Sequence, residues 1–175
     1  MKTTKNQIAV LAASALLLAG LAQAGPSPTP DTLANKVRHQ LAMLPYVNVF
    51  DDLSFRVDGG MVTLFGEVTR PVLKSDAENV VKKVEGVSQV NNQIEVLPLS
   101  PMDNRIRMRE YRAVFSGPLQ RYAMGTLPSI RIIVKNGNVT LTGLVSSSMD
   151  KQLAYMRANA VPGVFSVNNQ LQVEK

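Results

Sequence analysis

The sequence contains no cysteine and no tryptophan, and His39 is its single histidine. The absence of cysteine excludes a disulfide framework, a thiolate metal site and a cysteine nucleophile. It also removes the residue through which a bacterial lipoprotein carries its lipid. A lone histidine without a second one four residues away makes a poor metal site. We therefore expect neither a metal nor a cofactor.

Patterns that would indicate an enzyme are missing as well. There is no phosphate-binding G-x-G-x-x-G or Walker sequence, and no nucleophile elbow around a serine. The adjacent Asp51 and Asp52 precede a predicted strand, and we interpret them as part of a solvated loop. A general acid–base pair would need a pocket, which the sequence does not predict. We expect a non-enzymatic protein without a small-molecule substrate.

Strongly apolar sequence is confined to the N-terminus. Two lysines precede an apolar run from Ile8 to Leu21, and an A-x-A site ends at Ala24. This order predicts a signal peptide over residues 1–24, cleaved after Ala24. An uncleaved membrane anchor is the alternative, but the run is shorter than the ~20 residues that cross a bilayer. Because no other segment is as apolar, we expect an exported protein that is soluble or peripherally bound to a membrane.

An internal repeat accounts for most of the remaining chain. Residues 57–96 align without a gap on residues 134–173, a shift of 77 positions, with 17 identities among 40 pairs. Two copies are too few for a solenoid, so the repeat indicates tandem domains. We predict a Pro-rich lead-in over 25–30, a first domain over 31–97, a Pro linker over 98–101 and a second domain over 102–175.

Each copy predicts a helix, two strands, a second helix and a last strand. Apolar residues alternate at Leu53, Phe55 and Val57, which is the period of a strand. In the flanking segments they recur every three or four residues, as on one face of a helix. A strand, a helix and a strand form a crossover unit. The predicted fold class is α+β: two tandem α-β-β-α-β modules, each a three-stranded mixed sheet packed on two helices.

The second helix of each copy has its own expected apolar face. In the first copy this face comprises Leu73, Ala77, Val80, Val81 and Val84. In the second copy the clearest stripe comprises Met149, Leu153, Met156 and Ala160, joined by Ala154 and Val161. The two stripes do not align under the shift of 77, so we expect the second helix to be rotated or more fully buried. Ser147 and Asp150 resemble a capping box at its start.

Recurring glycines and asparagines are interpreted as structural. In each copy one glycine lies in a hairpin turn that needs positive φ, one at a strand end where another element approaches closely, and one past a helix as a left-handed C-cap. These are Gly60, Gly66 and Gly86 in the first copy and Gly137, Gly143 and Gly163 in the second. The asparagine pairs at 91–92 and 168–169 are expected to bond turn backbone, with a binding surface as the alternative.

Charge separates the two copies. Residues 31–97 hold 7 basic and 9 acidic residues (7 − 9 = −2), whereas residues 101–175 hold 10 basic and 4 acidic (10 − 4 = +6). Three arginines of the second copy are spaced i, i+4 and i+7 and so share one helix face. Basic side chains beside aromatic ones suit the headgroup level of an anionic membrane. The candidate contact residues are Arg105, Arg109, Arg112, Tyr111, Arg121 and Tyr122.

Both copies also carry a recognisable family pattern, V-x-L-x-G-x-V before the second helix and G-V-x-x-V after it. The first copy supplies it at residues 62–68 and 86–90, and the second at 139–145 and 163–167. The chain therefore resembles BON domains, the "bacterial OsmY and nodulation" family. The resemblance implies the module order given above and an association with phospholipid, the cell envelope and osmotic stress. In two-copy envelope members it implicates the first helix of the second domain in lipid contact.

The resemblance therefore implies a periplasmic envelope protein that binds an anionic phospholipid surface through Arg105, Arg109, Arg112 and Tyr111. A solvated helix face is the alternative for these charges. An adaptor that docks on an envelope protein, or associates with itself through a sheet edge, is the alternative for the whole protein. Nucleic acid also binds basic patches, but an exported protein rarely meets it, so we expect no nucleic-acid partner.

Overall fold

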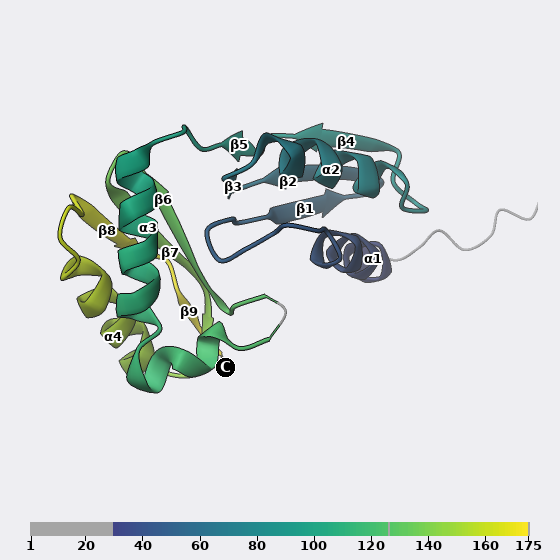
Figure 1. Cartoon of the computed structure of the whole chain (residues 1–175). Coiled ribbons are helices and arrows are strands. Elements are labelled where there is room, and N and C mark those ends of the chain that lie inside the picture. Colours follow the sequence, from purple (N-terminus) through teal and green to yellow (C-terminus); the bar gives the residue numbers. More distant parts are fainter. Residues whose placement is uncertain (1–29, 126, 175) are drawn as a thin grey trace, which may run out of the picture.

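The computed structural model describes residues 30–125 and 127–174 and shows two modules side by side (Figure 1). In each module two helices pack on a small mixed sheet, which confirms the predicted α+β class. The predicted signal peptide, residues 1–24, lies outside the described residues. Among the described residues, no helix is both long and apolar enough to cross a membrane.

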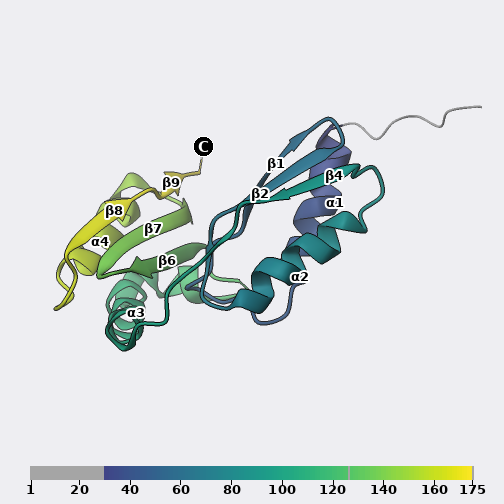
Figure 2. The same ribbon diagram turned by 90° about the horizontal axis from the view of Figure 1, so that it is seen from above.

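The first module follows the predicted order, with its last strand in two pieces. Its elements are α1 (Pro30–Ala42), β1 (Ser54–Asp58), β2 (Met61–Phe65), β3 (Glu67–Val68), α2 (Pro71–Lys82), β4 (Gln89–Asn92) and β5 (Glu95–Val96). The sheet order is β1-β2-β4, with β1 antiparallel and β4 parallel to β2, while β3 pairs with β5. Seen from above, α1 and α2 lie together beneath this sheet (Figure 2).

The second module repeats this arrangement with one addition. Its elements are α3 (Pro101–Val114), the 3-10 helix η1 (Gly117–Ala123), β6 (Ile130–Lys135), β7 (Asn138–Val145), α4 (Ser148–Asn159), β8 (Ser166–Asn169) and β9 (Gln172–Val173). The register is conserved between the copies, because Phe55 pairs with Leu64 and Ile132 with Leu141, both shifted by 77. The sequence did not predict η1.

The apolar face predicted for α4 is wrong for Met149, Met156 and Ala160, although Ala154 and Val161 are buried as predicted. Met149 and Met156 are exposed, at 79% and 52%, whereas Ala154 and Ala158 are fully buried. The buried positions 150, 154, 158 and 161 correspond to 73, 77, 81 and 84 of the first copy under the shift of 77. The helices are therefore equivalent, not rotated. The methionine periodicity misled because the buried face uses small alanines and an aspartate, Asp150, in place of large apolar residues.

The glycine positions are confirmed at the strand ends and in the second hairpin turn, whereas in the first turn the positive φ (58°) falls on Gly59 and not on Gly60. A Cβ on Gly143, whose φ is +116°, would lie 1.9 Å from the Ser129 carbonyl oxygen, and Gly66 meets Asp52 in the same way. The turn between β6 and β7 uses Asn136 and Gly137 with φ of 52° and 76°, as a tight hairpin requires.

The predicted C-caps are wrong, because α2 ends at Lys82 and its C-cap Lys83 is right-handed. Gly86, with φ of 95°, instead occupies the third position of a β-turn that Val87 N–H closes on the Val84 carbonyl. A type II turn needs positive φ at that position. The second copy has the same turn with Pro162 before Gly163.

The second asparagine of each pair bonds backbone, as predicted. Asn92 Nδ2 donates to the Lys74 carbonyl at 2.8 Å, and its Oδ1 accepts from Ile94 N–H at 3.2 Å. Asn169 makes the equivalent bonds to Lys151 and Leu171. Each of these side chains ties a helix to the break between the two pieces of the closing strand.

The first module reaches into the core of the second. Val49, in the loop between α1 and β1, is buried with the core residues of the second module, and Phe50 packs beside it. The Val49 carbonyl accepts from Ile132 N–H of β6 at 2.8 Å. The Phe50 ring contacts Tyr111 of α3 edge-on, with centroids 6.5 Å apart. The two modules therefore share one apolar interface in addition to their linker.

The interpretation of Asp51 and Asp52 as a solvated loop is wrong. Asp51 is fully buried and accepts from Thr69 N–H at 2.6 Å, the Thr69 hydroxyl at 2.7 Å and Asn48 N–H at 3.0 Å. These bonds brace the loop that presents Val49. Asp52 is half-buried, and burial raises its pKa although Arg131 lies near enough to oppose the rise.

Candidate functional site

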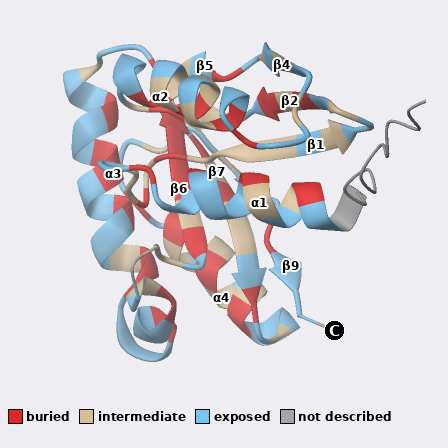
Figure 3. Ribbon diagram, turned by 90° about the vertical axis from the view of Figure 1, so that its right-hand side faces the viewer, coloured by how far each residue is buried: buried red, intermediate tan, exposed pale blue. Residues whose placement is uncertain are grey.

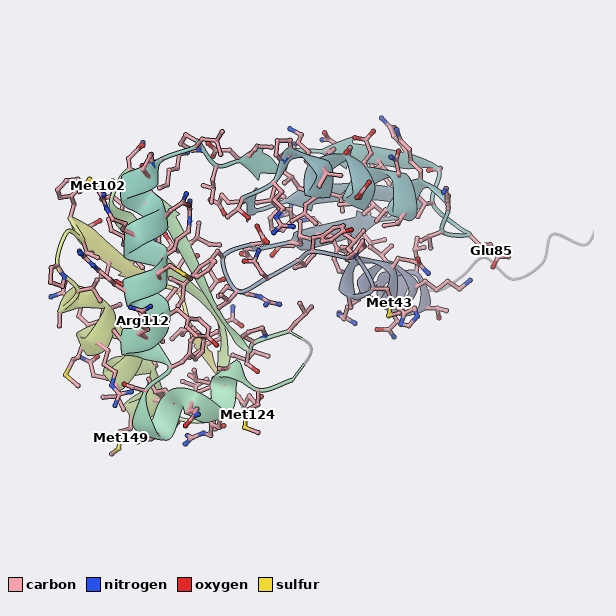
Figure 4. The ribbon with its side chains drawn as sticks, in the orientation of Figure 1. Met43, Glu85, Met102, Arg112, Met124 and Met149 are labelled. Atoms are coloured by element: carbon pink, nitrogen blue, oxygen red, sulfur yellow. The ribbon has the colours of Figure 1, made fainter. Side chains whose placement is uncertain are left out.

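The exposed face of α3 carries three arginines and no acidic residue. Arg105, Arg109 and Arg112 are all exposed, as the i, i+4, i+7 spacing predicts. Both acidic residues of this helix, Asp103 and Glu110, are instead buried against the sheet. Figure 4 shows Arg112 on the outside of the helix. Arg105 and Arg112 form no hydrogen bond or ion pair with any described residue, so their charges face solvent uncompensated.

The buried face of α3 is held by polar contacts to β6 and its turn. Asp103 accepts from the backbone N–H groups of Asn136 and Gly137 at 2.9 and 2.8 Å. Arg107 Nη2 donates to the Val134 carbonyl at 2.7 Å. These bonds fix the rotation of the helix, and so they fix which side the three exposed arginines point to.

Glu110 is fully buried, and neither of its carboxylate oxygens has a hydrogen-bond partner in the described part of the chain. Burial raises the pKa of Glu110 to about 8. At neutral pH its carboxyl is therefore mostly protonated and contributes little negative charge to the helix. The net positive charge of α3 at neutral pH is therefore larger than a count of its ionisable residues suggests.

A groove of about 390 Å³ lies where the C-terminal ends of α3 and α4 meet. Arg109, Arg112 and Arg157 line it, above an apolar floor of Ala113, Ala160, Val161 and Pro162. Arg109 Nη1 donates to the Pro162 carbonyl at 3.1 Å, and Arg157 Nη1 donates to the Val114 and Ser116 carbonyls. Arg112 forms no hydrogen bond within the described residues, so its guanidinium can bind a ligand. Because no carboxylate lines the groove, the groove favours an anion.

The second module exposes several large apolar side chains, and three of them lie on α3 with the arginines. The full set is contributed by both helices of the second module and by adjacent loops, and comprises Met102, Met108, Tyr111, Met149, Met156 and Phe165. Figure 4 shows Met102 at the upper end of α3 and Met149 at the lower end of the module. Mixed cationic and apolar side chains on one surface are typical of interfacial membrane contact.

The structure removes Tyr122 from the predicted contact surface and leaves Arg121 exposed in an ion pair. Tyr122 is buried, donates its hydroxyl to Asp150 at 2.9 Å and accepts from Ser146 N–H at 2.8 Å. Arg121 pairs with the same Asp150 carboxylate at 2.7 Å. The Ser147 hydroxyl and Tyr122 also hold the pKa of Asp150 below its usual value. These residues lock η1 to the start of α4, a contact that only folding brings together.

Tyr111 has two roles in the structure. Its ring is 39% exposed, and it packs on Phe115 with centroids 5.1 Å apart and on Phe50 of the first module. It therefore lies where the basic face meets the module interface.

A cleft of about 980 Å³ between the modules was not predicted from the sequence. Asp52 and Glu67 line it together with Arg131. Burial raises the pKa of Glu67, and repulsion from Asp52 and Glu95 adds to the rise. His39 is exposed on α1, and no group of three or more potential metal ligands occurs within residues 30–125 and 127–174.

The model of the BON domain family matches residues 30–98 and 123–175. The chain belongs to the BON-domain family. The second match begins after α3, so the arginine-bearing helix lies outside the part of the second module that the BON pattern describes. The family match therefore says nothing about the charge of α3, which depends on the residues of the helix and their contacts.

The chain is 27% identical over 147 residues to the osmotically inducible protein Y of Escherichia coli, a match that covers 82% of this chain and 73% of that protein. Two structures of CdsD, a structural protein of the type III secretion system of Chlamydia trachomatis, align with 14% identity and a TM-score of 0.28. They cover 82% of this chain and 98% and 93% of theirs. So low a TM-score supports no inference about this BON protein.

Proposed function

We propose that this BON-domain protein is a non-enzymatic periplasmic protein that binds anionic phospholipid surfaces through the exposed face of α3. The observation that carries the proposal is the separation of charge across this helix. Three arginines face solvent, while Asp103 and Glu110 are buried. Each basic residue near an anionic surface contributes about 1 kcal/mol, which suits weak and reversible attachment.

The surrounding side chains support a membrane over a solvated helix face. Exposed Met102 and Met108 on the same helix supply apolar surface that water disfavours and lipid accepts. The groove at Arg112 has the charge and the apolar floor to accommodate a lipid phosphate. Similarity to the osmotically inducible protein Y supports a role in envelope maintenance under osmotic stress.

Vesicle co-sedimentation tests the proposal. The chain from Gly25 to Lys175 should sediment with phosphatidylglycerol vesicles at low salt, be released at high salt and ignore phosphatidylcholine vesicles. Arg105→Glu combined with Arg109→Glu should weaken binding at least tenfold, since each reversal replaces an attraction by a repulsion.

The matched control is Arg56→Glu combined with Lys83→Glu, which makes the same change in net charge at exposed sites of the first module. It should leave most of the binding intact. Equal losses from the two pairs would mean that only net charge matters, and a wild-type chain that never sediments would refute the proposal.

A further inference from the structure

The outer edge of β6 is covered by polar contacts from two directions. Ile132 N–H donates to the Val49 carbonyl, and the Val134 carbonyl accepts from Arg107. Asp103 accepts from the N–H groups of the turn that follows. A strand edge with unpaired backbone groups is a template for another strand. In the second module this edge is closed.

The equivalent edge of β1 is open. Because the registers match under the shift of 77, Phe55 corresponds to Ile132 and Val57 to Val134. The Phe55 N–H and the Val57 carbonyl therefore point away from β2, as their counterparts point away from β7. Within residues 30–125 and 127–174 neither group forms a hydrogen bond to another element.

Side-chain burial shows the same difference. In β6, Ile130, Ile132 and Val134 are fully buried. Their counterparts in β1 and just before it, Leu53, Phe55 and Val57, are only partly buried. Figure 3 displays β6 as largely buried and β1 as intermediate. The first module has the same apolar strand, but no segment within residues 30–125 and 127–174 covers it as Val49-Phe50 covers β6.

A groove runs along the open edge. One part, of about 620 Å³, lies between β1 and α1 and is lined by Ala34, Arg38, Leu53, Phe55, Val57 and Phe65 among others. A smaller cavity of about 170 Å³ continues it toward the second module, between Leu41, Phe55, Leu127 and Arg131. Arg38 lines both parts and lies over the Phe55 ring at 5.9 Å.

Charge identifies the kind of occupant. Arg38 is exposed, and Arg131 has a buried Nη1 without a hydrogen-bond partner. The segment that fills the equivalent place in the second module, Val49-Phe50, is apolar and is followed by Asp51-Asp52. Asp51 and Asp52 line the smaller cavity beside Arg131 and offset its charge, so Arg38 is the arginine of the groove without a carboxylate partner among the described residues. An exposed arginine beside an apolar groove complements a peptide of that same character.

We propose that the edge of β1 is a docking site for an extended peptide of a partner protein, with apolar residues followed by carboxylates. The peptide adds a strand beside β1: its backbone pairs with Phe55 N–H and the Val57 carbonyl, its apolar side chains enter the groove, and its carboxylates meet Arg38. This site is separate from the basic face of α3.

A synthetic peptide tests the proposal. The probe is Val-Asn-Val-Phe-Asp-Asp-Leu with blocked ends, which copies residues 47–53. Added to the 15N-labelled chain from Gly25 to Lys175, it should shift the amide resonances of Leu53, Phe55 and Val57 in a saturable manner. A peptide with serine in place of phenylalanine should bind at least tenfold more weakly.

Two variants separate edge docking from non-specific association. Arg38→Glu should weaken binding of the probe at least tenfold, and a probe with lysines in place of its two aspartates should recover binding to that variant. Arg56→Glu lies on the same strand with an exposed side chain and is the matched control, which should bind the probe like the wild type.

Three results would overturn the proposal. The first is the absence of shifts at millimolar probe, and the second is shifts confined to Ile132 and Tyr111, which would mean that the probe only displaces the chain's own loop. The third is a concentration-dependent dimer, measured by light scattering, that blocks the probe and is lost in Arg38→Glu. That result would assign the edge to a second copy of this chain.

Discussion

At the scale of single residues, α3 is unusual for the charges that it buries. The buried positions of α1 are leucines and a valine, whereas those of α3 include Asp103, Arg107 and Glu110. Asp103 and Arg107 are compensated by bonds to β6 and its turn, but Glu110 is not. An unpaired buried carboxylate destabilises a fold unless it holds a proton. The stability of the second module should therefore depend on pH.

Glu110→Gln should remove that dependence. The pKa of Glu110 is raised from 4.5 to about 8, so between these values the folded chain retains a proton that the unfolded chain has lost. The stabilisation is fully present below pH 4.5 and is lost as pH rises to 8, by at most about 1.4 kcal/mol per pH unit. Urea unfolding at pH 5, 7 and 9 should show this decline in the wild type, and the variant should be the more stable protein at pH 9.

Glu174→Gln is the control, because it neutralises an exposed glutamate. Its unfolding midpoint should follow that of the wild type at each pH. If the wild type and Glu110→Gln keep the same difference in unfolding free energy from pH 5 to 9, Glu110 does not titrate in this range.

At the scale of elements, α2 and α4 show how one position in a repeat can hold different residues. Under the shift of 77, Leu73 corresponds to Asp150 and Val81 to Ala158, yet all four are buried. Aspartate is tolerated at 150 because Tyr122, Arg121 and Ser147 bond it. Because Ala154 and Ala158 are fully buried in a close-packed core, this face of α4 has no room for larger side chains.

Substitutions on opposite faces of α4 should therefore differ in their effects. Ala158→Leu should lower the free energy of unfolding by about 1–3 kcal/mol, because it overpacks a fully buried site. Met149→Gln and Met156→Gln should each change it by less than about 0.5 kcal/mol, since both side chains are exposed. Chemical denaturation of the three variants measures these differences. A larger loss for Met156→Gln than for Ala158→Leu would place the buried face on the methionine stripe.

At the scale of the whole molecule, the first module acts as a brace for the second. Val49 and Phe50 fill the space between α3 and β6, and the buried Asp51 holds their loop in place. Across the interface Lys135 also pairs with Glu95 at 2.6 Å, but both side chains are about half exposed. An exposed ion pair stabilises little. The apolar contact is therefore the main coupling between the modules.

Val49→Asp should uncouple the two modules. It places a charge without a partner inside the core of the second module, which the folded state avoids by releasing the loop. We expect the single thermal transition of the wild type to separate into two, and the radius of gyration from small-angle X-ray scattering to increase. Leu99→Ser, at a linker position that is 95% exposed, is the control and should keep one transition. A single transition in Val49→Asp at an unchanged radius would refute the bracing role.

The sequence alone determined the repeat, the order of elements within each module, the hairpin glycines and the arginine spacing on α3. Strand and helix periods and turn geometry depend only on neighbouring residues, and the repeat is visible by comparing the sequence with itself. The family resemblance rests on the same local patterns and is confirmed by the family match.

The tertiary structure decided which of the equivalent residues are buried, covered or free. Folding buries Asp103 and Glu110, so the exposed face of α3 carries arginines without acidic residues, and it places Tyr122 in the core. It also covers the edge of β6 with hydrogen bonds that the edge of β1 does not receive within the described residues. Each of these outcomes depends on contacts between residues far apart in the chain. Nearly equal local patterns therefore gave two modules with different surfaces, because burial and pairing are set by what packs against a strand or helix.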